Sequence, residues 1–340
     1  MKIAIIGALW TSNFGDVLLA KLLKDKLVML GHSVIMPNAS NSVKNEAGLE
    51  EEKFKISESD CILFCGGGYF SEPPGNSFKW AISRYKSLFK YATYCKIKKI
   101  PYSIIGVGAG PINSFVARKV ISHVCSGAEN ILLRDNESIK AIKNLNQNYN
   151  LIEVSDLVLS INDIYELGPV YNSVDKIGVH LTLNGREQIK PILKYVKENK
   201  NSYDFYLIED NPGEYDRLCY EYTDIKELFA DKYITYKSID EFVSQIHSFD
   251  MVITSKLHVG IVAAALNKKV CSLPYHAKVK RLYDEFDRSD VVLEDFHNPS
   301  RIYAHVSNCY ESEPITIPSK MLEKSRKINM FIEEKFGEKK

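Results

Sequence analysis

Several features that would place a protein in a class at once are missing from this sequence. No apolar run approaches the roughly 20 residues that a helix needs to cross a bilayer, and VGIVAAAL, among the longest, covers only 259–266. The dinucleotide fingerprint G-x-G-x-x-G is also absent. Charges nearly cancel, with 44 Lys and Arg against 43 Asp and Glu, so no overall field favours nucleic acid as a partner.

The cysteines form no metal-binding or disulfide pattern. They number seven, include no C-x-x-C pair, and in three cases (Cys61, Cys65 and Cys271) lie inside apolar runs. We therefore expect thiols used as small core residues in a reduced, cytoplasmic protein, with no metal site. The start, MKIAIIGALW, is followed by Asn13 and Asp16 and is predicted to be a first strand, not a signal peptide.

The sequence does contain short apolar runs that alternate with longer amphipathic stretches. Runs without polar alternation are typical of strands covered on both faces, and their alternation with helices indicates parallel sheets. At 340 residues, two domains are expected. The pattern pauses at 160–175, which contains Gly168 and Pro169.

The prediction is an α/β fold of two Rossmann-like domains that face each other across a cleft. An N-terminal domain is expected over 1–167, a C-terminal domain over 168–318, and a closing amphipathic helix with a tail over 319–340. Strands are expected at 2–8, 32–37, 60–66, 101–108, 130–135 and 151–159, then at 176–181, 203–210, 233–236, 250–255 and 269–274. Helices are expected at 15–30, 78–97, 113–126 and 135–146, then at 185–199, 213–230, 238–248, 257–267 and 319–336. Ligands in such sheets bind at the carboxyl ends of the strands.

Polar residues follow the first predicted strand. Ser12 or Asn13 could cap the next helix, Gly15 would allow a ligand close to the backbone, and Asp16 suits the helix dipole. Free N–H groups at a helix start attract anions. A capped helix start without function explains the same residues equally well.

Glycine-rich turns follow the third and fourth predicted strands. Gly66, Gly67 and Gly68 are consecutive, and Gly108 lies in GVGAGP. Three glycines favour a ligand-cradling loop, because a tight turn needs only one or two. Arg134 ends the fifth strand, where a guanidinium can bind a carboxylate or phosphate or pair with a surface Asp.

In the second domain, candidate residues follow three strands. His180 follows the first, Lys256 and His258 follow the fourth in TSKLH, and Tyr275 and Lys278 follow the fifth. A lone His near an apolar helix is most often a core residue, but a cation beside it favours an anionic ligand that touches both. The last two residues are explained equally well as a pocket edge or as a solvated helix start.

Taken together and in this order, these motifs resemble the polysaccharide pyruvyl transferase family. They are NFGD (13–16), FCGGGYF (64–70), GVGAGP (106–111), LRDNES (133–138), SDLVLS (155–160), TSKLHVGIVAAALN (254–267) and PYHAK (274–278). The resemblance covers roughly residues 1–285. It implies two Rossmann-like domains of the glycosyltransferase-B type.

The resemblance also implies an activity. Members of the family move the pyruvyl group of phosphoenolpyruvate onto two hydroxyls of a sugar, which forms a cyclic ketal and releases phosphate. Their Arg-x-His motif binds phosphoenolpyruvate and carries the essential His; here it reads Lys256-Leu257-His258. Lys is a point charge and cannot clamp a carboxylate with two parallel bonds. Arg134 is therefore an alternative residue for that contact.

The expected mechanism assigns a role to each of these residues. His258 would protonate the methylene carbon of the donor, and Arg134 and Lys256 would hold its carboxylate and phosphate. Asp16 would orient or deprotonate an acceptor hydroxyl. Phosphoenolpyruvate serves as co-substrate, with no cofactor and no metal, and the partner is a sugar or a lipid-linked oligosaccharide. A lipid-linked acceptor would bring a cytoplasmic enzyme of bacterial capsular, exo- or cell-wall polysaccharide synthesis to the inner membrane face.

Two other functions fit the same pattern. A nucleotide-sugar-dependent glycosyltransferase or epimerase of this fold would need a site for base and diphosphate in the second domain, whereas the three-glycine loop lies in the first. A non-enzymatic sugar-binding protein of polysaccharide assembly would not require Arg134, Lys256 and His258 to converge. The acceptor sugar and the oligomeric state are not encoded in any motif found here.

Overall fold

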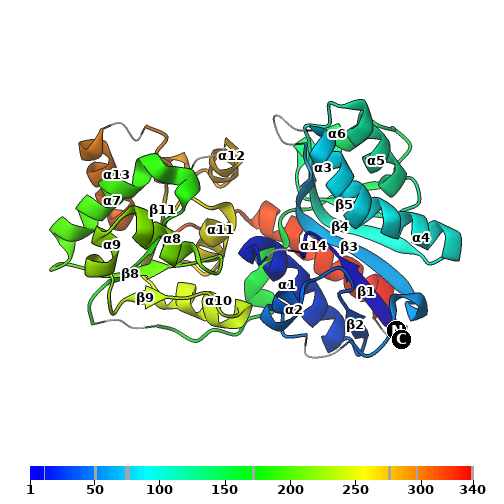
Figure 1. Ribbon diagram of the computed structural model, residues 1–340, viewed down its shortest axis with the longest axis horizontal. Helices are drawn as coiled ribbons and strands as arrows, with labels where there is room; N and C mark the ends of the chain where they lie inside the picture. Colours follow the sequence, from blue (N-terminus) through cyan, green and yellow to red (C-terminus); the bar gives the residue numbers. More distant parts are fainter. Residues whose placement is uncertain are drawn as a thin grey trace. The chain divides into compact units, whose positions relative to one another are not determined.

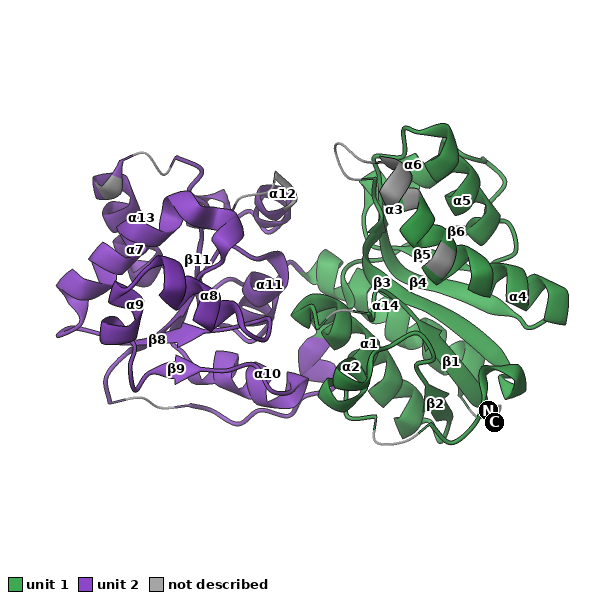
Figure 2. Cartoon of the chain, in the orientation of Figure 1, with its two compact units in different colours: residues 1–160, 319–340 green, residues 161–318 purple. Residues whose placement is uncertain are grey.

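A computed structural model describes residues 1–10, 12–49, 52–72, 77–170, 173–274, 277–295 and 298–337. The chain forms two compact units, shown in Figure 2. Unit 1 comprises Met1–Ser160 and Ser319–Lys340, and unit 2 comprises Ile161–Pro318. The division thus falls seven residues before the predicted boundary at 167/168, and the closing helix is part of unit 1 instead of a third segment.

Unit 1 is built on a six-stranded parallel sheet in the order β2-β1-β3-β4-β5-β6 (Figure 1). Its strands are β1 (Lys2–Ile6), β2 (Ser33–Ile35), β3 (Cys61–Phe70), β4 (Tyr102–Ala109), β5 (Ile131–Leu133) and β6 (Leu151–Glu153). Its helices are α1 (Phe14–Met29), α2 (Asn41–Glu46), η1 (Ile56–Glu58), α3 (Ser77–Arg84), the π-helix η2 (Tyr85–Phe89), α4 (Lys90–Lys98), α5 (Phe115–Cys125), α6 (Asn136–Lys143), η3 (Leu157–Asp163, shared with unit 2) and α14 (Ser319–Phe336).

The strands of unit 1 form because their side chains are apolar on both faces. Ile3, Ile5 and Ile6 of β1 are fully buried, as helices cover both sides of the sheet. The chain runs from β1 outward to β2 and returns to β3 on the other side of β1. This reversal is a topological switch point, the place where open α/β sheets bind ligands at the carboxyl ends of their strands.

Unit 2 repeats the principle with a five-stranded parallel sheet in the order β11-β10-β7-β8-β9. Its strands are β7 (Lys176–His180), β8 (Asp204–Ile208), β9 (Tyr233–Ile234), β10 (Met251–Thr254) and β11 (Lys269–Ser272). Its helices are η4 (Leu183–Gly185), α7 (Arg186–Asn199), α8 (Glu214–Glu221), α9 (Asp224–Leu228), α10 (Ile239–Ser248), α11 (Leu257–Ala265), α12 (Ala277–Glu285), η5 (Ser289–Val291) and α13 (Pro299–Glu311). Here the switch point lies between β7 and β10.

Helix α14 is an integral layer of unit 1. Ile328, Ile332 and Phe336 are buried, and Ile328 Cδ1 would lie 3.3 Å from a Cβ atom placed on Gly106 of β4. Ser325 Oγ donates to the carbonyl of Asp156 at 2.8 Å. The amphipathic pattern of 319–336 is therefore explained by packing against the first unit.

Several predicted elements differ from the structure. The strand expected over 60–66 continues to Phe70 in β3, and the strand expected over 101–108 continues to Ala109 in β4, so Gly66–Gly68 and Gly108 lie within strands and not in the expected loops. The helix expected over 78–97 is divided into α3, η2 and α4 by a π-helical turn. The helix expected over 213–230 is interrupted at Tyr222, whose extended backbone separates α8 from α9. The strand expected over 151–159 ends at Glu153, because Asp156 Oδ1 accepts a hydrogen bond from the Val158 N–H at 3.1 Å and turns the chain into η3.

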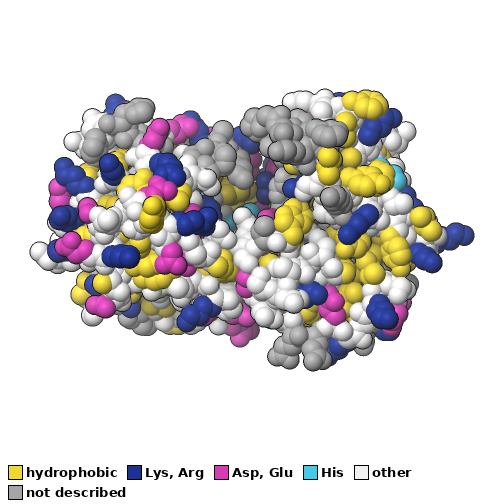
Figure 3. Space-filling view, viewed as in Figure 1, with side chains coloured by type: hydrophobic (Ala, Val, Ile, Leu, Met, Phe, Trp, Pro, Cys, Tyr) yellow, Lys and Arg dark blue, Asp and Glu magenta, His cyan; other side chains and the backbone are white. Residues whose placement is uncertain are grey.

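The surface agrees with the balanced composition. In Figure 3, basic and acidic side chains are interspersed over both units in this view. No helix in the described part of the chain has both the length and the apolar character needed to cross a bilayer.

Candidate functional site

The switch point of unit 1 brings Asp16 against the three-glycine strand end. A Cβ atom on Gly67 would lie 2.3 Å from Asp16 Oδ1, and one on Gly66 would lie 2.9 Å from Leu19 Cδ1. Gly67 also has φ +93°, a conformation that side-chain-bearing residues rarely adopt. The glycines are thus explained by the close approach of α1, and they place the Asp16 carboxylate directly on the end of β3.

The start of α1 has the predicted cap. Asn13 is exposed at the N-cap position, and its Oδ1 accepts the Asp16 N–H at 3.4 Å. Gly15 is buried in the first turn, where it allows α1 to pack against the sheet. Asp16 is half-buried and lies at the positive end of the helix dipole, which favours its charged form.

Arg134 extends from the end of β5 across the neighbouring strand ends. A Cβ atom on Gly108 would lie 2.6 Å from Arg134 Nε, and one on Gly68 would lie 3.7 Å from Arg134 Nη2. Its Nε lies 3.5 Å from Asp135 Oδ2, and its Nη1 lies 3.8 Å from Asp156 Oδ2. The side chain is 15% exposed, so this guanidinium is held in place by two carboxylates and two glycines and remains accessible.

Asp156, which the sequence did not single out, is one of these carboxylates. Its side chain is 8% exposed and faces Arg134 Nη1. Asp135 has a second function, because its Oδ1 accepts the N–H of Ser138 at 2.7 Å and caps α6. Unit 1 therefore gathers Asp16, Gly66–Gly68, Gly108 and Arg134 at one edge of its sheet, all of them predicted from the sequence.

The switch point of unit 2 holds a buried polar network centred on Asp210. His180, at the end of β7, has Nε2 3.0 Å from Asp210 Oδ1 and Nδ1 3.3 Å from Thr254 Oγ1. Lys256 Nζ donates to the same Asp210 oxygen at 2.6 Å and lies 3.8 Å from Glu214 Oε2. Lys256 thus has a carboxylate partner supplied by the protein, which the local motif TSKLH does not reveal.

The electrostatics of this network follow from its geometry. Burial alone would raise the pKa of Asp210, but the neighbouring His180 and Lys256 outweigh burial and hold the pKa of this carboxyl well below its usual range. The side chains of His180 and Asp210 are 0% and 4% exposed, whereas that of Lys256 is 19% exposed. Lys256 is therefore the most exposed of these three side chains.

Helix α11 begins directly beside this network. Lys256 occupies the N-cap position with extended backbone, and its N–H donates to Thr254 Oγ1 at 3.0 Å. Leu257 and His258 form the first turn of α11 and are half-buried. The Lys-x-His motif is thereby placed at a helix N-terminus, where partial positive charge favours an anion. Tyr275 lies outside the described residues, as does the side chain of Lys278.

Two clusters of described residues bring three potential metal-ligand atoms within 4.8 Å of one another: Cys271, His305 and Cys309, and His180, Asp210 and Glu214. In the second, Lys256 already neutralises the carboxylates. In the first, His305 Nε2 lies 3.1 Å from the Val291 carbonyl oxygen. Both sets of ligand atoms have protein partners, and we assign no metal to either.

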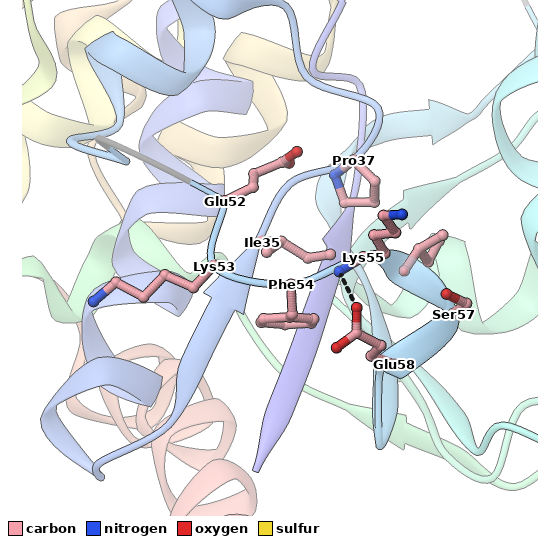
Figure 4. A pocket seen from close by; sticks show the side chains of 9 residues that line it. Ile35, Pro37, Glu52, Lys53, Phe54, Lys55, Ser57 and Glu58 are labelled. Atoms are coloured by element: carbon pink, nitrogen blue, oxygen red, sulfur yellow. Dashed lines mark hydrogen bonds between the residues drawn. The ribbon is translucent and has the colours of Figure 1, made fainter.

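A hollow of about 720 Å³ lies elsewhere on unit 1 (Figure 4). It is lined by Ile35, Pro37, Glu52, Lys53, Phe54, Lys55, Ile56, Ser57 and Glu58. The carboxylate of Glu58 accepts the Lys55 N–H at 3.0 Å and pairs with Lys2 at 2.9 Å. None of the residues predicted from the motifs lines this hollow, and its two carboxylates, Glu52 and Glu58, are paired with Lys44 and Lys2, so we do not assign the reaction to it.

Comparison with known proteins decides the family. Residues 12–277 match the sequence pattern described as polysaccharide pyruvyl transferase, a range that includes Asp16, Arg134, Asp210 and His258. The chain belongs to the polysaccharide pyruvyl transferase family. As a member, it is a transferase of polysaccharide biosynthesis, and the family implies a pyruvyl donor and a sugar acceptor. No curated protein matches the chain in sequence.

Solved structures show the same fold at low sequence identity. A putative UDP-N-acetylglucosamine 2-epimerase from Listeria monocytogenes has a TM-score of 0.61 at 10% identity, over 98% of this pyruvyl transferase family member and 96% of that chain. The Neisseria meningitidis UDP-GlcNAc 2-epimerase bound to UDP-GlcNAc has 0.59 at 13%, over 98% and 100%. Anabaena Alr3699/HepE in complex with UDP-glucose has 0.56 at 12%, over 98% and 99%. These likenesses concern the fold alone and confirm the predicted glycosyltransferase-B-like class.

Proposed function

We propose that this pyruvyl transferase family member moves the pyruvyl group of phosphoenolpyruvate onto two hydroxyls of one sugar and releases phosphate. The observation that carries the proposal is the position of Lys256-Leu257-His258. The motif begins α11 at the switch point of unit 2, inside the family match, with its cation fixed by Asp210. A helix N-terminus with an adjacent ammonium group and an imidazole suits an anionic donor that must be protonated.

The donor chemistry assigns the proton to His258. Phosphoenolpyruvate is an enol ester of phosphate, so protonation of its methylene carbon leaves positive character on C2. The first sugar hydroxyl attacks C2 and loses its proton, which restores the acid. The second hydroxyl then displaces phosphate, which departs with the oxygen that joined it to C2 and takes up the second proton. Imidazole titrates near neutral pH and can supply the first proton.

Asp210 has a positioning role in this proposal. It holds Lys256 Nζ at 2.6 Å and His180 Nε2 at 3.0 Å through one oxygen. A Lys held in this way has less freedom to follow a ligand than a solvated one, which compensates in part for the two-pronged contact that an Arg would make. The donor phosphate then binds the exposed edge of Lys256 and the N–H groups that begin α11.

In this proposal, unit 1 supplies the groups that bind the acceptor sugar and a carboxylate or phosphate. Asp16, fixed against Gly67, accepts a proton from a sugar hydroxyl or orients it. Arg134, held by Asp135 and Asp156, offers its accessible edge to a carboxylate or phosphate. The protein needs neither a metal nor an organic cofactor for these steps. A sugar carried on a lipid would bring the enzyme to the inner face of the cytoplasmic membrane, and nucleic acid is no partner in this scheme.

Thermal stabilisation by phosphoenolpyruvate tests the donor. We expect phosphoenolpyruvate to raise the melting temperature of the wild type saturably. His258→Ala and Lys256→Ala should each lower the apparent affinity for phosphoenolpyruvate at least tenfold. His247→Ala is the matched control, because His247 also lies in unit 2, in α10, and its Nε2 lies 2.7 Å from the carbonyl oxygen of Gly168, away from the Asp210 network. Stabilisation by nucleotide sugars and none by millimolar phosphoenolpyruvate would overturn the proposal in favour of a nucleotide-sugar enzyme.

A further inference from the structure

The two tryptophans of the chain flank one guanidinium in unit 1. The Cζ atom of Arg84 lies 4.8 Å from the ring centroid of Trp10 and 5.9 Å from that of Trp80. Trp10 follows β1 and is 39% exposed, whereas Trp80 lies on α3 and is 8% exposed. Such cation–π contacts hold an Arg by its flat faces and leave its N–H edge free for another partner.

Two of the three guanidinium nitrogens of Arg84 have no partner among the described residues. Its Nε and Nη1 are shielded from solvent, yet no acceptor lies within hydrogen-bonding distance of either. A buried cation whose donors are unpaired is costly, and native proteins contain few such groups without a reason. Arg134 differs in this respect, because Asp135 and Asp156 already face it. An anion bound beside Arg84 would supply the acceptors that these two nitrogens lack.

The helix changes its geometry directly after Arg84. The π-helix η2 begins at Tyr85, directly after this residue, and single π-helical turns inside α-helices are frequent at functional sites. Burial lowers the pKa of Arg84, while the nearby Tyr69 and Asp16 counteract the shift. Arg84 therefore lies within electrostatic range of the carboxylate to which we assign the acceptor hydroxyl.

We propose that Trp10, Trp80 and Arg84 form a subsite that binds the phosphoester group of the acceptor sugar. The guanidinium donates to phosphate oxygens, and the exposed part of Trp10 packs against the sugar or its carrier. The inference that this subsite binds a sugar phosphate depends only on contacts within unit 1. The inference that this sugar phosphate is the acceptor rests on the proposed function. A phosphoester is favoured over a neutral sugar because its negative charge adds to that of Asp16 in offsetting the partly buried guanidinium.

Intrinsic fluorescence is the direct measurement, because both tryptophans of the chain lie at this subsite. Glucose 1-phosphate, UDP-N-acetylglucosamine and farnesyl diphosphate are titrated into the full chain, with glucose and glucuronate as comparisons. We expect saturable changes with phosphoesters and none with glucose. A tighter response to the nucleotide sugar or to farnesyl diphosphate identifies the carrier. Saturation by glucuronate alone, or by no phosphoester, would overturn the subsite.

Variants separate the subsite from the rest of the machinery. Arg84→Gln should weaken the binding of glucose 1-phosphate about 10- to 100-fold, the loss expected for a charged hydrogen bond. Arg84→Lys keeps the charge and should bind more tightly than Arg84→Gln. It also serves as the test variant if Arg84→Gln does not fold. Trp10→Phe should still bind glucose 1-phosphate, but the change in tryptophan emission on binding should be smaller. Stabilisation by phosphoenolpyruvate should be unchanged in Arg84→Gln. Its loss would make Arg84 a donor residue and overturn the acceptor assignment. Absence of phosphoenolpyruvate binding in the wild type, with sugar-phosphate binding intact, would instead overturn the proposed function and leave the subsite standing.

Discussion

The ammonium group of Lys256 lies 2.6 Å from Asp210 Oδ1, although 46 residues separate the two in the chain. Glu214 Oε2 lies 3.8 Å from the same nitrogen. The Lys-x-His motif therefore does not present an isolated cation. Its charge is balanced by the protein, and the donor must compete for the exposed edge of Lys256.

Asp210→Asn should destabilise the protein by about 3 kcal/mol, because the change removes the nearer buried counterion of Lys256 and leaves the more distant Glu214, whose Oε2 lies 3.8 Å from Lys256 Nζ. Urea unfolding of the two proteins measures the difference. Glu221→Gln is the control: it removes one partner of the exposed pair with Arg186 and should cost less than about 1 kcal/mol. Equal losses in the two variants would show that the Asp210 network adds nothing beyond a surface pair.

The same carboxylate should make stability depend on acid pH. The pKa of Asp210 is lower in the folded protein than in the unfolded chain, where it is about 3.9. The unfolded state therefore binds the proton first, and the contribution of Asp210 is complete above that pH and is lost progressively below it. Between pH 6 and pH 3, the free energy of unfolding should fall further in the wild type than in Asp210→Asn. Parallel curves would contradict the depressed pKa.

Gly108→Ala should remove activity by displacing Arg134. The new Cβ atom would lie 2.6 Å from Arg134 Nε and 2.7 Å from its Cζ, so the guanidinium must leave its place between Asp135 and Asp156. We expect at least tenfold slower phosphate release from phosphoenolpyruvate and acceptor, with a retained circular-dichroism spectrum. Gly168→Ala is matched to it, since no atom lies within 4 Å of its added Cβ and turnover should be unchanged. Full activity in Gly108→Ala would remove Arg134 from the site.

Cys309 should be a thiolate at neutral pH. A hydrogen bond from Cys271 lowers the pKa of Cys309 to about 6, with help from His305 and against the effect of burial. As the pH is raised, the thiolate absorbance of the wild type at 240 nm should therefore increase with a midpoint near pH 6. This step should be missing in Cys309→Ser. Cys125→Ser should keep the step, because burial raises the pKa of Cys125 to about 12. A first midpoint above pH 8 in the wild type would contradict this assignment.

Much of the fold could be predicted because apolar runs with no polar alternation identify strands that are covered on both faces. The run at 2–8 became β1 and the run at 250–255 became β10. The run at 151–159 shows the limit of this rule, since its last residues are buried in the turn η3 and not in a strand. An apolar run shows that residues are buried, but not whether they form a strand. Here the backbone leaves the strand because the Asp156 side chain accepts one local hydrogen bond from the Val158 N–H.

The candidate site was predictable in part for a similar reason. Asp16 lies in the helix after β1, Gly67 lies near the carboxyl end of β3 and Arg134 directly follows β5, so their common edge could be inferred from the strand pattern alone. Asp210 and Arg84 could not be assigned in this way, because their partners depend on strand order and on a π-helical turn. The pairing of Asp210 with Lys256 requires β8 and β10 to lie on opposite sides of β7, an arrangement that no spacing encodes. Asp156 lies in the SDLVLS motif, but nothing in that motif singled it out or indicated its contact with Arg134.

The place of α14 in unit 1 has a consequence for biosynthesis. A ribosome releases the sheet of unit 1 first, but Ile328, Ile332 and Phe336 are added only after all of residues 161–318 have been made. Unit 2 is continuous in the chain and can fold as it emerges, whereas β4 and α1 must wait with one apolar face uncovered. While the ribosome makes unit 2, the incomplete unit 1 still exposes the apolar surface that α14 will cover. Chaperones are therefore expected to bind the nascent chain at unit 1 during the synthesis of unit 2.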